Sequence, residues 1–269
     1  FNFDNASSNE LTLKVALSAV STEGALRNLH AEAAGKDFDE LCEQTRQQWD
    51  DELAALECEG TDSQKQMLYT SLYHTMINPS IYMDTDRRYR GLDGNVHVAE
   101  GFDNYTIFSL WDTYRALHPL LALLKPRQNA DMVRSMLAHQ QQSVHRLLPV
   151  WSLMGNEGWC MTGYHAVSVL ADALAKGADI DRRAALEAMT ATANSKRMPG
   201  IEAYRQLGYV PYDRDATAAS NTVEYAYDDW AIYAAAKAAG ETAAAEEFAK
   251  RALSYRNVYN PQTGFACPR

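Results

Sequence analysis

Several features that would assign a function at once are missing from this sequence of 269 residues. No stretch approaches the ~18 consecutive apolar residues that a membrane-spanning helix needs, and no Walker, dinucleotide-binding, HExxH or Gly-x-Ser-x-Gly motif occurs. Basic residues are in the minority, with 25 Lys and Arg against 35 Asp and Glu. The resulting net charge of −10 argues against nucleic acids and anionic membrane surfaces as partners.

Cysteine is also scarce, with four residues and no CxxC pair. This spacing excludes the usual zinc and dithiol redox motifs, and we expect free, mostly buried thiols. Aromatic residues, in contrast, are plentiful, with 5 Trp and 15 Tyr. Such side chains most often build a core, but beside Asp, Glu and Asn they also suit a carbohydrate cleft.

Hydrophobic spacing predicts one strand followed by an almost wholly helical chain. Residues 11–19 alternate between apolar and polar, as a strand does, and its partner strands are expected elsewhere. Helical spacing begins near residue 22, and Thr61 with Gln64 forms a predicted capping box. Further helices are expected at 38–57, 61–78, 106–124, 127–146, 163–176, 181–195, 200–207, 219–239 and 241–255. Many antiparallel helices without a fixed repeat are typical of stacked helix pairs that close into an α/α toroid.

The most informative segment is 151–165, Trp-Ser-Leu-Met-Gly-Asn-Glu-Gly-Trp-Cys-Met-Thr-Gly-Tyr-His, where Glu157 stands between two glycines and two tryptophans. Trp151 and Trp159 could stack on a sugar and raise the pKa of the carboxyl by desolvation. A carboxyl in such surroundings suits proton donation to a leaving group. The structural alternative is that Glu157 lies in a loop that enters a helix and caps that helix. His165 is a further candidate, although a single histidine on a helix is more often a core residue.

A second segment, 111–118, reads Trp-Asp-Thr-Tyr-Arg-Ala-Leu-His. Asp112 and Arg115 are three residues apart and share a predicted helix face. Asp112 could bind sugar hydroxyls while the indole of Trp111 stacks on the ring. The alternative is a buried ion pair between Asp112 and Arg115.

A third segment, 222–230, reads Thr-Val-Glu-Tyr-Ala-Tyr-Asp-Asp-Trp. Glu224 and Asp228 are four apart on one helix face, where two acids repel each other unless a cation or ligand offsets their charge. Asn221, Glu224 and Asp228 are therefore candidate oxygen ligands for Ca²⁺, although EF-hand spacing is absent. The alternative is a solvated acidic face.

These three segments together resemble glycoside hydrolase family 92, a family of mostly bacterial exo-acting α-mannosidases. The similarity lies in residues 101–119, in Asn156-Glu157 running into Gly163-Tyr164-His165, and in residues 224–230, with further likeness at 68–74 and 263–265. Three long motifs in the same order are a specific signal, and the resemblance extends over nearly the whole chain.

The resemblance implies an N-terminal β-sandwich followed by an (α/α)₆ catalytic toroid, a Ca²⁺ requirement, and removal of terminal α-linked mannose with inversion of configuration. By motif, Glu157 is the general acid, and a second carboxylate ~6.5–9.5 Å away activates water. We expect mannose-containing oligosaccharides to be bound by Trp111, Asp112, Arg115, Trp159, His165, Asp228 and Asp229. The resemblance also implies a secreted or periplasmic enzyme, although the sequence shows no signal peptide.

The same comparison predicts how the chain divides. Residues 1–30 would hold the last strand of the sandwich and a linker, and residues 31–269 a toroid truncated at its C-terminal end. The catalytic base is expected beyond residue 269, so the chain would associate with the rest of its enzyme and lack activity alone. Two other functions stay open: a non-catalytic helical carbohydrate-binding or scaffold module, and another α/α-toroid enzyme such as a phosphorylase.

Overall fold

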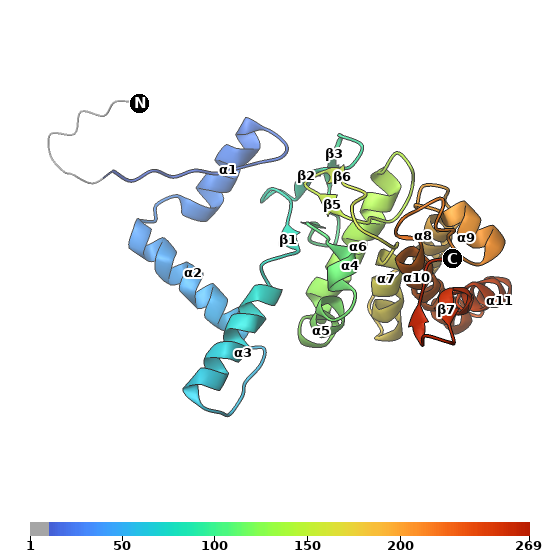
Figure 1. The fold of residues 1–269 in the computed structure, drawn as a ribbon. Helices are drawn as coiled ribbons and strands as arrows, with labels where there is room; N and C mark the ends of the chain where they lie inside the picture. The colour runs from blue at the N-terminus through green and yellow to red at the C-terminus, as the bar shows by residue number, and fades with distance from the viewer. Residues whose placement is uncertain (1–10) are drawn as a thin grey trace.

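The computed structural model describes residues 11–269, and helices dominate this part of the chain (Figure 1). The helices are α1 (Thr22–Ala33), α2 (Phe38–Leu53), α3 (Asp62–Thr75), α4 (Leu110–Thr113), α5 (Leu117–Leu124), α6 (Pro126–Gln142), α7 (Ala166–Ala175), α8 (Arg182–Ala193), α9 (Ile201–Leu207), α10 (Ala218–Ala239) and α11 (Thr242–Arg251). A short 3₁₀ helix, Ser254–Val258, follows them. The expectation of a mainly α chain is therefore confirmed.

The strands are short and form four separate antiparallel pairs. The pairs are β1 (Ser80–Ile81) with β4 (Tyr105–Thr106), β2 (Arg88–Arg90) with β3 (Val96–Val98), β5 (Ser152–Leu153) with β6 (Asn156–Glu157), and β7 (Tyr259–Asn260) with β8 (Phe265–Ala266). None of them was predicted from the sequence. Strands of two or three residues are too short to show the alternation that identifies a longer strand.

Local sequence accounts for several helix ends. The predicted capping box at Thr61 and Gln64 is present, and Asp37 with Glu40 forms a second one at the start of α2. Pro126 opens α6, where its missing N–H costs nothing. At the other end of a helix, Gly240 takes a φ of 77° and ends α10 in the left-handed conformation that glycine adopts most easily.

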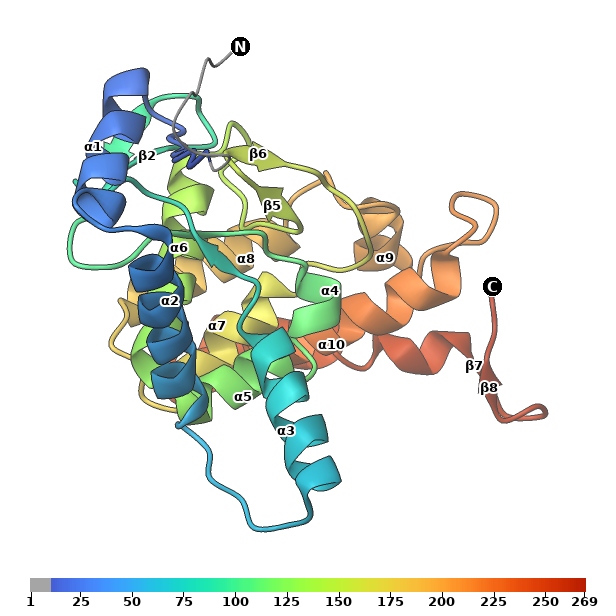
Figure 2. The ribbon, with the colours of Figure 1, turned by 90° about the vertical axis from the view of Figure 1, so that its left-hand side faces the viewer.

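The core lies where α10 packs on α7, α8 and α11 and where α6 packs on α5 and α7. Its large, fully buried side chains include Phe108, Tyr164, Tyr204, Tyr225, Met136 and Phe248. Figure 1 shows α2 and α3 standing apart from this body, and Figure 2, viewed from that side, shows them in front of it. No residue of α2 is buried, and Leu72 is the one buried residue of α3. The main cluster of buried side chains therefore runs from Tyr105 to Phe248.

Two expectations about secondary structure need correction. The helix predicted over 106–124 is broken into α4 and α5, because Ala116 takes a non-helical φ of −142°. The strand predicted over 11–19 is not formed: this segment has no ladder partner among the described residues, and Leu13 and Leu17 are 78% and 84% exposed. A strand alone has no partner for its backbone N–H and C=O groups. The first ten residues of the proposed 1–30 unit lie outside the described range.

The cysteine expectation is correct in one respect only. All four thiols are free, but Cys42 and Cys160 are exposed, and Cys58 and Cys267 are only partly buried. Cys42 lies on α2, which has no buried face in this structure.

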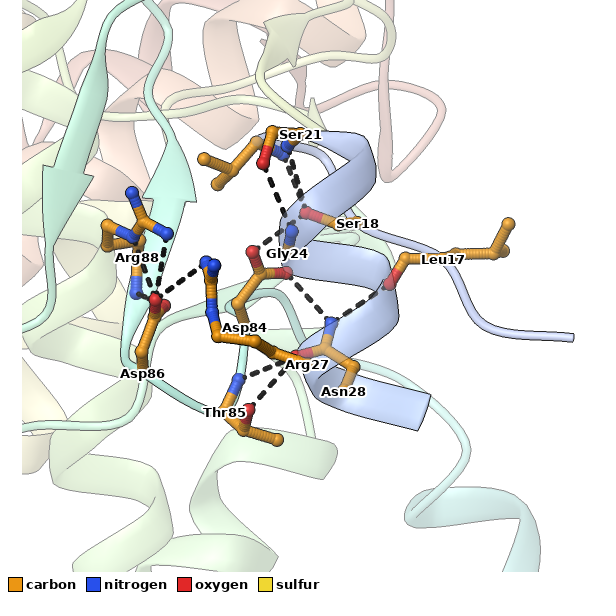
Figure 3. A network of polar contacts seen from close by, with 11 residues as sticks. Leu17, Ser18, Ser21, Gly24, Arg27, Asn28, Asp84, Thr85, Asp86 and Arg88 are labelled. Atoms are coloured by element: carbon orange, nitrogen blue, oxygen red, sulfur yellow. Dashed lines mark hydrogen bonds and ion pairs between the residues drawn. The ribbon is translucent and has the colours of Figure 1, made fainter. Parts of the chain in front are cut away.

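A buried polar network fastens α1 to the loop before β2 (Figure 3). Asp84 accepts hydrogen bonds from Ser18 at 2.7 Å and from the Asn28 amide at 2.9 Å, and Asn28 in turn accepts one from the backbone N–H of Thr85. A Cβ on Gly24 would come within 2.4 Å of the Asp84 carboxylate, so glycine allows this close approach. The network fixes the N-terminal helix to the rest of the chain.

Candidate active site

Glu157 lies on the β5–β6 hairpin rather than at a helix entrance. The hairpin is held against the core because the carbonyl oxygen of Ser152 accepts hydrogen bonds from the backbone of Ile107 and Phe108. The Ser152 hydroxyl also lies 2.9 Å from Nδ1 of the buried His139 on α6. The alternative that Glu157 caps the next helix is therefore wrong, since α7 begins nine residues later, at Ala166.

The Glu157 carboxylate is partly buried and accepts backbone hydrogen bonds from its own hairpin. Oε1 accepts from Trp151 at 2.8 Å and from Trp159 at 2.9 Å, and Oε2 accepts from Val150 at 3.1 Å. Burial raises the pKa of Glu157, and the backbone N–H groups oppose that rise without cancelling it. The expected elevation of its pKa agrees with this environment.

The second and third sequence segments meet at Glu224 on α10. Its Oε1 accepts hydrogen bonds from the Trp111 indole at 3.0 Å and from the Arg115 guanidinium at 2.9 Å, and its Oε2 accepts one from the Tyr114 hydroxyl at 2.9 Å. Burial tends to raise the pKa of Glu224, but these donors and the nearby His165 lower it overall. Glu224 is thus suited to remain an anion that holds three side chains of residues 111–115.

His165 and Asp228 lie directly behind Glu224. Nδ1 of His165 is 2.7 Å from an Asp228 carboxylate oxygen, and Nε2 is 3.5 Å from Oε2 of Glu224. Asp228 also accepts the backbone N–H of Tyr164. Both side chains are buried, at 1% and 0% exposure, so neither presents an open surface to a ligand in this structure.

Asp229 belongs to a separate network of buried hydrogen bonds, which does not include Glu224. It accepts hydrogen bonds from the hydroxyls of Tyr164 and Tyr204, each at 2.7 Å, and pairs with Arg251 at 2.9 Å. Arg251 also donates to Asn194, beyond the end of α8. Since Asp229 is fully buried and is held by these three side chains, it joins α10 to α9, to α11 and to the segment just before α7.

The Asp112–Arg115 ion pair considered above is not formed. Arg115 pairs with Glu224, and the exposed Asp112 accepts a hydrogen bond from Ser109. The Ser109 hydroxyl also lies 3.9 Å from the sulfur of Met161, which follows the Glu157 hairpin. The start of α4 and the segment after Glu157 are therefore neighbours, which brings the first and second sequence segments together.

Trp159 lies at the edge of this region and is partly buried against the core. The Arg197 guanidinium stacks over its ring at 4.6 Å, and His145 meets the ring edge-on. Its backbone N–H, rather than its ring, contacts Glu157.

The proposed Ca²⁺ ligands do not converge. The amide of Asn221 donates to Asp215 and to Thr217, while Glu224 and Asp228 are committed to the donors described above. Within residues 11–269 no group of three or more His, Cys, Asp or Glu side chains is arranged to hold a metal ion. These residues therefore do not fit a Ca²⁺ site, whose oxygen ligands would have to face one point.

Sequence reasoning missed four residues that organise the region: Tyr114, Tyr164, Tyr204 and Arg251. Tyr114 stands inside the second segment, three residues after Trp111, so helical spacing could have indicated that the two share a face. Tyr204 and Arg251 carry no such signal, because their spacing to Asp229 is set by packing between helices.

The model of the glycosyl hydrolase family 92 catalytic domain matches residues 24–269. A GH92 alpha-mannosidase from Bacteroides thetaiotaomicron, solved alone and with mannoimidazole, is 47% identical with a TM-score of 0.91, and its unliganded structure aligns with 94% of this chain and 34% of its own. A GH92 inverting mannosidase from the same organism is 35% identical with a TM-score of 0.88, over 94% of this chain and 35% of its own.

A curated relative, an "uncharacterized secreted glycosidase" from Arthroderma benhamiae, is 23% identical over 97% of this chain and 32% of its own length. The chain thus spans about a third of the length of these relatives. The described helices superpose on those of the GH92 structures, which confirms the expected fold class, the helices of an (α/α)₆ toroid. No helix within residues 11–269 is both long enough and apolar enough to cross a membrane.

Proposed function

Because this chain belongs to glycoside hydrolase family 92, we propose that it is part of the catalytic domain of an enzyme that removes terminal α-linked mannose from glycans with inversion of configuration. The observation that carries this proposal is Glu157, a partly buried carboxyl with a raised pKa, in a chain that is 47% identical to a GH92 alpha-mannosidase. The mannoimidazole complex of that relative supports a mannose-type ligand.

Glu157 is proposed as the general acid that protonates the glycosidic oxygen. Its Oε1 already accepts two backbone hydrogen bonds and its Oε2 only one. Protonation of Oε2 therefore disturbs one backbone hydrogen bond, whereas protonation of Oε1 would disturb two. The hairpin would hold Glu157 in place while burial keeps a share of the carboxyl protonated at higher pH than usual.

An inverting enzyme also needs a carboxylate that activates water on the opposite face of the sugar. Asp228 and Asp229 are both fully buried and hydrogen-bonded, so neither is positioned to hold a water at the sugar. We therefore propose that the base is supplied by another part of the enzyme.

Calcium dependence is proposed from the family resemblance alone. Asn221, Glu224 and Asp228 do not fit a Ca²⁺ site, so no step described here involves the ion. A secreted or periplasmic location is proposed on the same ground, and the curated relative is described as secreted.

The direct test is to follow hydrolysis of an α-mannoside by the complete enzyme with ¹H NMR. Inversion requires β-mannose as the first product. First release of α-mannose would contradict inversion. Phosphate-dependent turnover would indicate a phosphorylase, and binding of mannosides without turnover would indicate a non-catalytic module.

A further inference from the structure

Glu224 is the point at which the predicted sugar-binding side chains converge, and its own carboxylate is held by three protein donors. A carboxylate offers about four acceptor positions. Trp111 and Arg115 donate to Oε1, and Tyr114 donates to Oε2. Nε2 of His165 faces the remaining side of Oε2 at 3.5 Å. Three acceptor positions of Glu224 are therefore taken by protein donors, and the His165 ring covers the side of Oε2 that remains.

His165 supports this carboxylate from within the core. Its Nε2 is buried and has no hydrogen-bond partner within the described part of the chain, and the nearest acidic oxygen is Oε2 of Glu224. The ring is fixed on two sides: Asp228 holds Nδ1 at 2.7 Å, and the Tyr114 ring stacks on the imidazole with centroids 4.1 Å apart and planes 15° apart. Because the ring is fixed in this way, Nε2 can face only Oε2 of Glu224.

The outer side of the cluster is open. The Arg115 side chain is 53% exposed and uses one N–H on Glu224, and its Cζ lies 4.7 Å from the centre of the Tyr114 ring. A guanidinium has five N–H donors, so several remain to face outward. Trp111 is likewise only partly buried. Arg115 and Trp111 are thus exposed enough to contact a sugar, whereas Glu224 and His165, which hold them in place, lie behind them.

We propose that His165 and Glu224 are positioning residues: the Asp228–His165 pair holds Glu224, and Glu224 holds the Trp111 indole and the Arg115 guanidinium in the orientation that receives the terminal sugar. This proposal rests on the proposed function and replaces the expectation that His165 and Asp228 touch the sugar. Preorganised partners reduce the ordering cost of binding, so their loss should weaken ligand affinity more than turnover.

The test uses His165→Asn in the complete enzyme. The asparagine amide can still reach Asp228, but no imidazole nitrogen then faces Oε2 of Glu224, which keeps only the Tyr114 hydroxyl as a donor. We expect KM for an α-mannoside and Kd for mannoimidazole to rise about tenfold or more, with kcat changed much less, in addition to the loss of Tm that follows from removing part of a buried ring. Glu224→Gln should have the same signature with a larger rise, because it replaces an acceptor by a donor among the donors from Trp111, Tyr114 and Arg115.

Tyr204→Phe is the matched control. It removes one hydroxyl from Asp229, in the neighbouring structural network, and should lower Tm while KM and Kd stay unchanged. If His165→Asn fails to fold, Tyr114→Phe provides the same measurement, because it removes one donor to Glu224 and keeps the ring that stacks on His165.

The proposal is overturned if the folded variants lower Tm as Tyr204→Phe does and leave KM and Kd at wild-type values. Failure of the proposed function is a separate result. If the wild-type enzyme does not hydrolyse α-mannosides, that function is wrong, while the mannoimidazole Kd of each variant still decides the positioning role.

Discussion

The indole nitrogen of Trp111 lies 3.0 Å from Oε1 of Glu224, although 113 residues separate the two in the sequence. Trp111 belongs to α4 and Glu224 to α10, so the bond joins two of the three segments that stand out in the sequence. Since the two helices build one cluster, substitutions in either should affect the same binding function.

Asp112→Ala should weaken mannoside binding more than it weakens folding. Asp112 is exposed, and its carboxylate is bonded only to the neighbouring Ser109 among the described residues. Loss of a charged hydrogen bond to the sugar would cost ~1.5–3 kcal/mol, whereas an exposed substitution changes stability by about 0.5 kcal/mol. KM, inhibitor Kd and Tm measured together separate the two effects. Ser109→Ala, which removes only the partner of Asp112, is the control, and a large loss of Tm with unchanged affinity would show a structural role for Asp112.

Acid should destabilise the domain through two buried histidines. Burial lowers the pKa of His118 and of His139 to about 4, whereas an unfolded histidine titrates near 6.5. The unfolded state therefore binds more protons between these values, so stability is fully present above pH 6.5 and falls as pH drops toward 4. Each histidine would account for ~3 kcal/mol at most.

Denaturant unfolding at pH 7 and pH 4.5 measures this loss. His139→Gln should make stability less dependent on pH, and the matched change at the exposed His30 should not. Equal pH dependence in wild type and in His139→Gln would show that His139 does not contribute.

Exhaustive chelation with EDTA should abolish activity of the complete enzyme, and Ca²⁺ should restore it better than Mg²⁺ or Zn²⁺. The family resemblance and the lack of a His/Cys cluster in the sequence favour a hard cation with oxygen ligands. Because Asn221 is bonded to Asp215 and Thr217, Asn221→Ala should leave the Ca²⁺ concentration for half-maximal activity unchanged. Full activity without any divalent ion would remove the metal from the account.

Residues close in sequence were the most predictable part of the structure. Helical spacing and the Thr61 capping box placed the helices, since these signals act within one or two turns. Glu157 was singled out by its neighbours, but its hairpin was not foreseen, because the bonds that hold it come from Ile107 and His139.

The roles of adjacent acids were not predictable from spacing. Asp228 and Asp229 were both expected to bind the sugar, yet one faces His165 and the other faces Tyr204 and Arg251. Neighbouring positions on a helix point about 100° apart, so tertiary packing decides what each meets.

The most direct test of the account is the leaving-group dependence of Glu157→Gln in the complete enzyme. General acid catalysis contributes roughly 10²–10⁴-fold, and it matters least when the leaving group departs without a proton. We predict that the variant loses hydrolysis of a natural α-mannobiose by about this factor while a strongly activated aryl α-mannoside is largely spared. Turnover of the disaccharide near the wild-type rate would contradict the assignment of Glu157 as the acid.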